Sequence, residues 1–254
     1  MSAKGRVMLH ESDGGQTLRP GQGKTGRAQV CHGGSCPAVL LPGVPKTRRG
    51  KTRHGTHIAI ANFLLYFADV SSDHRKRKLT YNIPGDAHFL TFSCYRQYPL
   101  LTKERTRQWF VDAMKTARTK HEFAIWAYVI MPEHIHLLVF PRPTEYRIER
   151  FLYDLKRPVS WKAKKHLIET GNEEWLNRLT VSKGKDDVFR FWQQGGGYDE
   201  NLFKGKTIEN VFDYIHANPI RRGLVKLATE WTWSSARYWE GCDDVLITMD
   251  EIDI

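Results

Sequence analysis

Two strand-like segments separated by only two residues constrain the fold of this 254-residue chain more than any other feature. Residues 122–131 and 134–140 are rich in β-branched, aromatic and aliphatic side chains, and only Pro132 and Glu133 stand between them. So short a connection can join only neighbouring antiparallel strands. The chain is therefore expected to contain an antiparallel sheet that includes this hairpin.

The segments around the hairpin predict the rest of the domain. Residues 88–95 and 188–193 have strand composition, and residues 102–120, 147–166 and 208–217 place apolar side chains at helical spacing. The order strand, helix, strand, strand, helix, strand is that of the split βαββαβ fold. The sequence thus predicts an α+β protein with a ferredoxin-like antiparallel sheet and helices on one face.

The distribution of charge divides the chain into three parts. Residues 1–80 carry 14 Lys and Arg against four Asp and Glu and show no lasting periodicity, which predicts a flexible, basic N-terminal extension over 1–79. Residues 80–239 form the expected folded domain, with a polar insertion at 169–187. Residues 240–254 hold six acidic and no basic side chains and are expected to form an acidic tail.

Composition narrows the class of protein. The net charge of +11 favours a polyanionic partner such as nucleic acid, although an ordinary solvated surface explains it equally well. No apolar run reaches the roughly 18 residues of a membrane span, and the first 30 residues lack the apolar core of a secretory signal. Four scattered cysteines do not make a disulfide framework. We expect a cytoplasmic protein with no membrane partner.

His134 and His136 stand two residues apart at the start of the second hairpin strand, so their imidazoles project from one face. Two neutral imidazoles side by side suit a divalent metal ion that takes one or more further ligands. The same pattern occurs on half-exposed strands without any metal, and the pair alone favours that structural explanation. A hydrolase with a His-x-His-x-His motif is excluded because position 138 is Leu.

Tyr214 and Asn218 are four residues apart, which places them on one face of a helix. A tyrosine hydroxyl can attack phosphorus when its phenolate is stabilised, and Asn218 could offer a carbonyl oxygen to the same metal ion. Two structural alternatives compete. Tyr214 could be a packed aromatic side chain, and Asn218 could cap a new helix that begins at Pro219. Tyr153 and Tyr198 are reserve candidates for a nucleophile.

Three blocks occur in a fixed order between residues 81 and 239: Met131–Val139, which contains both histidines, Phe191–Gln194, and Tyr214–Val225 followed by Trp233–Ala236. Together these blocks resemble the HUH single-tyrosine transposases, and most closely the branch associated with repetitive extragenic palindromes (REP). The resemblance extends over the whole expected domain. It implies a ferredoxin-like catalytic domain that cuts and rejoins single-stranded DNA.

The resemblance also implies a role for each site residue. Tyr214 matches the nucleophile, which attacks the scissile phosphate and leaves a 5′-phosphotyrosine and a free 3′-hydroxyl. His134, His136 and Asn218 match three ligands of a Mg²⁺ or Mn²⁺ ion. The implied partner is single-stranded or hairpin DNA, bound by a monomer or a homodimer. The alternative is a hairpin-DNA binding protein that derives from such a transposase and no longer cleaves.

Basic residues close to these blocks are candidates for DNA contacts. Those on the predicted helix 147–166 could follow backbone phosphates, and those just after the proposed nucleophile could hold a flanking phosphate. A solvated helix face explains the first group equally well. The candidates are Lys156, Arg157, Lys162, Lys164, Lys165, Arg221 and Arg222.

Overall fold

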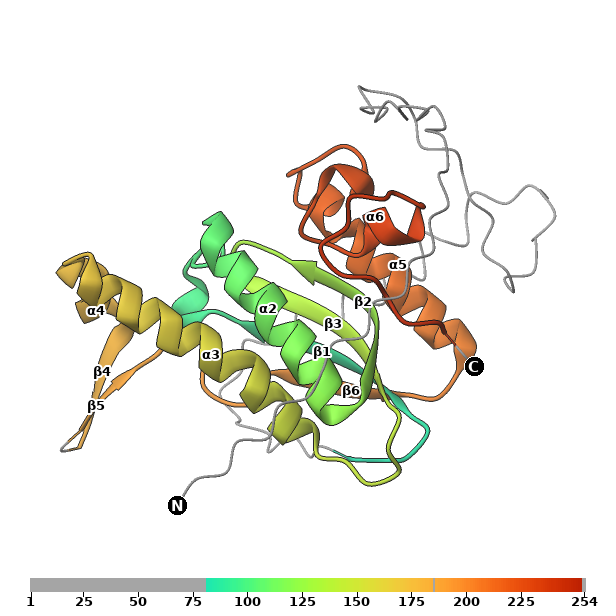
Figure 1. The fold of residues 1–254 in the computed structure, drawn as a ribbon, viewed down its shortest axis with the longest axis horizontal. Coiled ribbons are helices and arrows are strands. Elements are labelled where there is room, and N and C mark those ends of the chain that lie inside the picture. The colour runs from blue at the N-terminus through green and yellow to red at the C-terminus, as the bar shows by residue number, and fades with distance from the viewer. Residues whose placement is uncertain (1–80, 185, 253–254) are drawn as a thin grey trace, which may run out of the picture. The chain divides into compact units, whose positions relative to one another are not determined.

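A four-stranded antiparallel sheet organises the part of the chain that the computed structural model describes, residues 81–184 and 186–252 (Figure 1). The strand order β2-β3-β1-β6 is that of a split βαββαβ unit, so the predicted α+β, ferredoxin-like architecture is confirmed. The predicted N-terminal extension, 1–79, lies outside the described residues. In chain order the elements are β1 (Ala87–Ser93), η1 (Tyr95–Gln97), α2 (Glu104–His121), β2 (Phe123–Ile130), β3 (His134–Pro141), α3 (Ile148–Glu169), α4 (Glu173–Leu179), β4 (Thr180–Lys183), β5 (Asp186–Phe189), β6 (Tyr198–Leu202), α5 (Gly205–Arg221), η2 (Ala228–Glu230) and α6 (Ala236–Trp239).

The predicted hairpin is formed by β2 and β3. Across its connection the Met131 N–H donates to the His134 carbonyl oxygen at 2.9 Å. β3 pairs on its other side with β1, where Ser93 lies opposite His134 and Thr91 lies opposite His136. This register places both histidines beside the end of β1.

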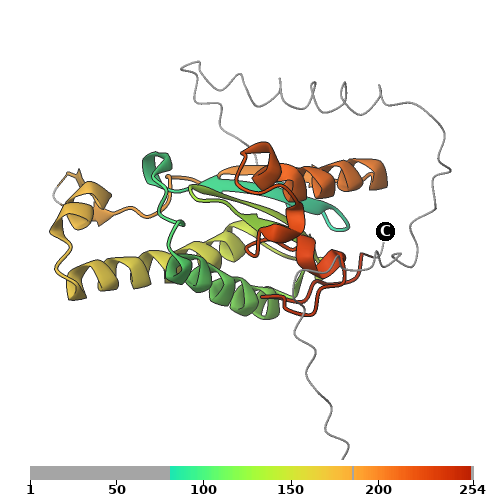
Figure 2. The same ribbon diagram turned by 90° about the horizontal axis from the view of Figure 1, so that it is seen from above.

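Alternation of side chains along the strands gives the sheet two buried faces. α2 and α3 cover the face to which β1 contributes Leu90 and Phe92. α5 covers the other face, where Phe89 and Leu138 are buried (Figure 2). The two helices of the βαββαβ unit thus share one face, as predicted, and α5 forms a third layer on the opposite face. None of the helices in the described part of the chain is long and apolar enough to cross a membrane.

The fourth strand of the sheet differs from the prediction. The sequence predicts it at 188–193, but β6 is the strand that pairs with β1, and β5 pairs with β4 in a separate hairpin. Gly197 lies so close to β1 that a Cβ atom there would come within 2.2 Å of the Thr91 carbonyl oxygen, and its φ is +89°. Only glycine suits both conditions. Gly197, the last residue of the glycine run 195–197, therefore returns the chain to the edge of β1.

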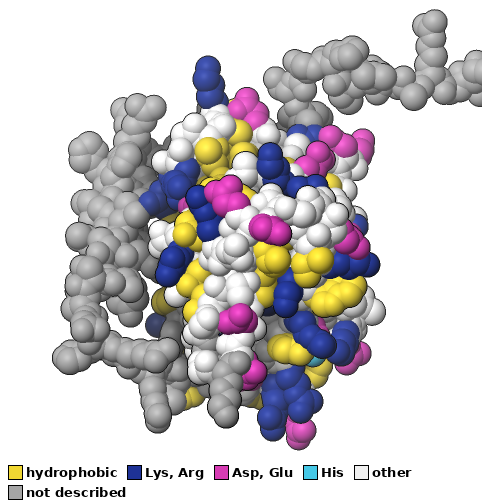
Figure 3. Space-filling model, turned by 90° about the vertical axis from the view of Figure 1, so that its left-hand side faces the viewer, with side chains coloured by type: hydrophobic (Ala, Val, Ile, Leu, Met, Phe, Trp, Pro, Cys, Tyr) yellow, Lys and Arg dark blue, Asp and Glu magenta, His cyan; other side chains and the backbone are white. Residues whose placement is uncertain are grey.

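The predicted polar insertion, 169–187, begins at the end of α3 and contains α4 and most of the β4–β5 hairpin (Figure 1). These elements project at one end of the domain, which faces the viewer in Figure 3. The Tyr98 ring, just after η1, lies 5.6 Å from the Trp175 ring of α4. α4 therefore packs against the segment that follows β1.

Candidate active site

His134 and His136 project from the same face of β3, as their spacing predicts. Their Nε2 atoms lie 3.1 Å apart. Two nitrogen ligands of one divalent ion, each about 2.1 Å from it and at a right angle, are about 3.0 Å apart. His136 is buried and His134 is partly buried. The pair therefore has the spacing of two ligands of a single ion.

A neighbour holds the other ring nitrogen of each histidine. Thr91 Oγ1 lies 2.7 Å from His136 Nδ1, and Glu133 Oε1 lies 3.1 Å from His134 Nδ1. Hydrogen-bond chemistry assigns the proton of His134 to Nδ1, because a carboxylate only accepts, and Thr91 can accept from His136 in the same way. Both Nε2 lone pairs then face each other at 3.1 Å, an arrangement that calls for a cation between them.

The electrostatics of this pair suit metal binding. Burial, helped by the positive charge of Arg221, lowers the pKa of His136 well below its usual value, so its imidazole is neutral. The hydrogen bond with His134, together with the Arg222 guanidinium, lowers the pKa of Glu133 to about 2. A neutral imidazole is the form that binds metals, and an ionised carboxylate is a common partner of the second ring nitrogen.

α5 brings Tyr214 against the histidine pair. The centroids of the Tyr214 and His136 rings are 5.3 Å apart. The guanidinium carbon of Arg221 lies 5.1 Å from the centroid of the Tyr214 ring. Tyr214 is only partly buried, so the same aromatic side chain packs against the sheet and reaches the surface.

Asn218 lies one turn beyond Tyr214 on α5, because the helix continues through Pro219 to Arg221. It does not cap a new helix. Asn218 is 7% exposed, and its Nδ2 donates to the Tyr214 carbonyl oxygen at 3.4 Å, which leaves Oδ1 as its donor atom for a metal ion.

Two imidazoles and an amide oxygen form the candidate donor set. They suit a divalent cation that accepts both nitrogen and oxygen ligands. Residues 81–184 and 186–252 contain no group of three or more His, Cys, Asp or Glu side chains that could hold a metal ion. The fit to a divalent cation therefore rests on the facing Nε2 atoms and on the buried amide of Asn218.

Comparison with known proteins assigns the family. Residues 85–218 match the family model described as "Transposase IS200 like". The match covers just over half of the chain, includes His134, His136 and Tyr214, and ends at Asn218. The chain belongs to the IS200-like transposase family.

Similar proteins include REP-associated members, which confirms the predicted resemblance. A putative REP-associated tyrosine transposase from Haemophilus influenzae is 26% identical over 147 residues, which cover 54% of this chain and 77% of that protein. A solved REP-associated tyrosine transposase bound to a REP hairpin is 21% identical with a TM-score of 0.49, over 72% of this chain and 94% of that one. A putative transposase from Deinococcus radiodurans is 16% identical with a TM-score of 0.34, over 56% and 95% of the two chains.

In this IS200-like transposase the basic side chains predicted on α3 do not join the Tyr214 site, because α3 and α5 cover opposite faces of the sheet. The Lys156 ammonium turns toward the glycine run and donates to the carbonyl oxygens of Gly195 and Gly196 at 3.2 Å each. The remaining four are at least partly exposed. The Arg157 guanidinium lies over the Tyr153 ring, and the Lys165 ammonium lies over the Trp161 ring. Lys162 Nζ is 3.8 Å from Asp112 Oδ2, and Lys164 is exposed.

Both predicted arginines after the nucleophile candidate lie at the site. Arg221 covers the Tyr214 ring, and Arg222 donates from Nη1 to Glu133 Oε1 at 2.6 Å. The Arg222–Glu133 ion pair links the end of α5 to the start of β3. It therefore joins the helix that carries Tyr214 to the strand that carries the histidines.

The reserve tyrosines lie in different places. Tyr198 begins β6 opposite Thr91 and donates its hydroxyl to Glu200 at 2.5 Å, so it is on the strand next to the site. Tyr153 is 55% exposed on α3. The structure thus keeps Tyr198 near the histidines and separates Tyr153 from them.

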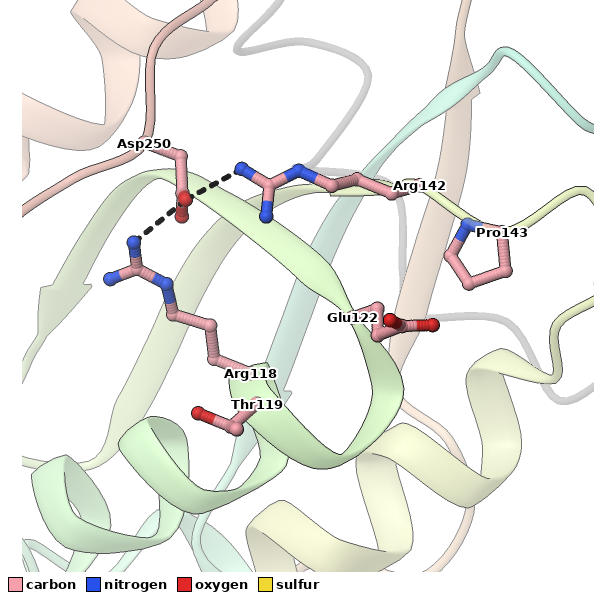
Figure 4. Close-up of a pocket in the computed structure, with 6 residues that line it drawn as sticks. All are labelled: Arg118, Thr119, Glu122, Arg142, Pro143 and Asp250. Atoms are coloured by element: carbon pink, nitrogen blue, oxygen red, sulfur yellow. Dashed lines mark hydrogen bonds and ion pairs between the residues drawn. The ribbon is translucent and has the colours of Figure 1, made fainter.

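A surface pocket of about 530 Å³ lies away from these residues (Figure 4). Its lining includes Arg118, Arg142 and Asp250, and the Asp250 carboxylate is paired with both guanidinium groups at 2.7 and 2.8 Å. Glu122 also lines the pocket, so the two carboxylates of the pocket balance the charge of its two guanidinium groups. Its residues connect the C-terminal segment to the domain and include none of the candidate site residues.

Proposed function

We propose that this protein cleaves and rejoins single-stranded DNA at hairpin sites through a covalent tyrosine–DNA intermediate. The observation that carries the proposal is the position of the Tyr214 ring, 5.3 Å from His136, whose Nε2 faces that of His134 at 3.1 Å. Membership of a transposase family supports a strand-transfer reaction. The REP-associated relative that is bound to a REP hairpin supports a hairpin substrate.

In the proposed reaction, the Tyr214 hydroxyl oxygen attacks the scissile phosphorus. The bond from phosphorus to the 3′ oxygen breaks, the phenolic proton is lost, and the departing 3′ oxygen takes up a proton. The products are a 5′-phosphotyrosine and a free 3′-hydroxyl. Attack by a new 3′-hydroxyl reverses these bond changes and rejoins the strands without an external source of energy.

His134, His136 and Asn218 would hold the divalent ion, Mg²⁺ or Mn²⁺. When bound, the ion supplies charge stabilisation to the phosphate oxygens. The protein itself positions the reacting groups. Thr91 and Glu133 hold the two imidazoles in orientation, and α5 places the nucleophile next to them.

We expect Arg221, which covers the Tyr214 ring, and Arg222, which pairs with Glu133 beside the histidines, to contact the phosphates next to the cut. The exposed cations of α3 would contact phosphates farther from the cut, on the opposite side of the sheet. Figure 3 shows Lys and Arg side chains scattered among hydrophobic and acidic ones at the end of the molecule that carries α4. We therefore expect separate phosphate contacts along the DNA rather than one continuous basic surface.

A denaturing gel tests the proposed function. Purified protein is mixed with labelled single-stranded hairpin DNA taken from the sequence that flanks its gene, with Mn²⁺ or with EDTA. We expect a protein–DNA adduct that requires the metal ion and is absent from the Tyr214→Phe variant. Tyr198→Phe is the matched control, because it removes a hydroxyl from the neighbouring strand, and it should retain the adduct.

Two other results would change the assignment. An adduct that persists in Tyr214→Phe and disappears in Tyr198→Phe would move the nucleophile to β6. Tight binding of several flanking hairpins without any adduct would support a hairpin-DNA binding protein that no longer cleaves.

A further inference from the structure

A polar pocket of about 430 Å³ lies at the end of β1, beside the histidine pair. It is lined by Ser93, Cys94, Arg96, Gln97 and Gln193. Its volume is within the range of about 300–1,000 Å³ that is typical of ligand pockets. No residue of this pocket belongs to the proposed catalytic set.

The register of the sheet places this pocket next to the reaction site. Ser93 is paired with His134, and it faces the same side of the sheet as Thr91, because side chains two residues apart on a strand share a face. Thr91 in turn contacts His136. A phosphate held at the histidines would therefore have the pocket as its immediate neighbour along β1.

The backbone at the rim of the pocket is strained. Arg96 and Gln97 are consecutive residues with φ of 52° and 55°, in the left-handed region that residues other than glycine seldom adopt. Strain of this kind is concentrated at functional sites, where the surrounding structure enforces it. Here the Arg96 N–H donates to Gln193 Oε1 at 3.2 Å, and the Gln97 N–H donates to the Cys94 carbonyl oxygen at 3.0 Å.

The chemistry of the lining matches the edge of a nucleic-acid base. Glutamine offers a donor and an acceptor side by side, which suits adenine, and arginine offers two donors, which suit guanine. Among the described residues, neither the side-chain amide of Gln97 nor the side-chain NH₂ group of Gln193 has a hydrogen-bond partner. An apolar ligand would leave these groups unpaired at a cost, whereas a base would pair with them.

We propose that this pocket binds the base next to the scissile phosphate, so that Gln97, Gln193 and Arg96 select the sequence at which the DNA is cut. This inference rests on the proposed cleavage function. The inference adds a site for DNA sequence specificity to the proposed active site.

The test uses a pool of hairpin oligonucleotides from the DNA that flanks the gene, with the nucleotides around the cleavage position randomised. Covalent adducts formed with Mn²⁺ are isolated and sequenced. The wild-type protein should enrich one base at one or more positions. Gln97→Ala and Gln193→Ala should lower that enrichment by about tenfold, the effect of losing one base contact, while still forming adducts.

Gln194→Ala is the matched control, because Gln194 is the exposed neighbour of Gln193 and does not line the pocket. It should keep the wild-type enrichment. Unchanged enrichment in both pocket variants, or a wild-type protein without any base preference, would overturn the inference although cleavage itself occurs.

The failure of the proposed function can be told apart from the failure of this inference. If the wild-type protein forms no adduct with any oligonucleotide, the same pool is bound in EDTA and the retained DNA is sequenced. A base preference that is lost in Gln97→Ala and kept in Gln194→Ala would then support the pocket without cleavage. If the wild-type protein and Gln97→Ala retain DNA of the same base composition, the inference that this pocket selects a base is overturned.

Discussion

At the level of single residues, two short contacts determine which nitrogen of each histidine faces the other. Thr91 holds Nδ1 of His136, and Glu133 holds Nδ1 of His134. Glu133 also binds Arg222 at the end of α5, so one carboxylate serves both the strand and the helix of the site. Such outer partners fix the orientation and basicity of ligating imidazoles.

Replacement of Glu133 should therefore weaken metal binding without a loss of fold. We expect Glu133→Ala to lower the affinity for Mn²⁺ by about 10- to 100-fold, the usual effect of removing an outer partner. Isothermal titration calorimetry with the DNA-free protein measures the affinity for Mn²⁺. Glu145→Ala, at an exposed position, should bind Mn²⁺ as the wild-type protein does. Equal affinities for the two variants would show that Glu133 has no part in the metal site.

At the level of elements, one partly buried cation, Lys156, joins α3 to the glycine run. Lys156 donates to two glycine carbonyls, its Nζ lies 4.4 Å from the centroid of the Phe92 ring, and its own carbonyl oxygen accepts from Trp192 Nε1 at 2.9 Å. Burial lowers the pKa of Lys156 to about 8. This lysine supports the loop that leads into β6.

That pKa predicts a dependence of stability on pH. An unfolded lysine has a pKa of about 10.4, so between about pH 8 and 10.4 the unfolded chain binds more protons than the folded chain. The contribution of Lys156 to the free energy of unfolding therefore rises with pH in this range. Urea unfolding measures the free energy of unfolding of both proteins at about pH 7 and about pH 9.5. The value for the wild-type protein minus that for Lys156→Met should be larger at the higher pH.

Lys164→Met controls for the removal of a positive charge from the same helix, because Lys164 is exposed. Its difference from the wild-type protein should stay constant between the two pH values. A constant difference for Lys156→Met as well would contradict the lowered pKa.

Local periodicity predicts some elements and not others. β2, β3 and α3 lie within a few residues of their predicted bounds, because their apolar spacing is a property of the segment itself. β6 has the polar sequence Tyr-Asp-Glu-Asn-Leu, which carries no strand signal. It is a strand because Gly197 brings the chain against β1, and such a contact between distant segments has no local pattern.

The site divides in the same way. The spacing of His134 and His136, and of Tyr214 and Asn218, is local and marks both pairs as candidates, whereas their predicted roles rest on the resemblance that the three blocks carry together. The contact of Thr91 with His136 spans 45 residues and depends on the register of β1 against β3, which the sequence does not specify. Lys156 shows the converse, since helical charge patterning predicts an outward cation and the structure turns it inward.

At the level of the whole molecule, the acidic C-terminal segment protects the edge of the sheet. β2 is an edge strand, and its register shifts between Ile125 and Ala127. At this irregularity the Ile125 N–H donates to Asp250 Oδ2 at 2.8 Å, and the Asp250 N–H donates to the Ile125 carbonyl oxygen at 3.1 Å. Because Asp250 occupies both backbone groups of Ile125, another chain cannot pair with β2 at this point. The acidic segment that composition marks as a tail is thus part of the domain.

Loss of the Asp250 side chain should weaken this cover. Asp250→Ala leaves the buried Ile125 N–H without its acceptor and separates Arg118 and Arg142 from their shared carboxylate, so we expect the free energy of unfolding to fall by about 2 kcal/mol. Urea unfolding measures the change, and light scattering at the midpoint should rise as the edge of β2 is exposed. Asp243→Ala, at an exposed position in the same segment, removes an equal charge and should unfold at the same urea concentration as the wild-type protein. If both variants unfold at the same urea concentration, the contacts of Asp250 add nothing to stability beyond the charge that both variants lose.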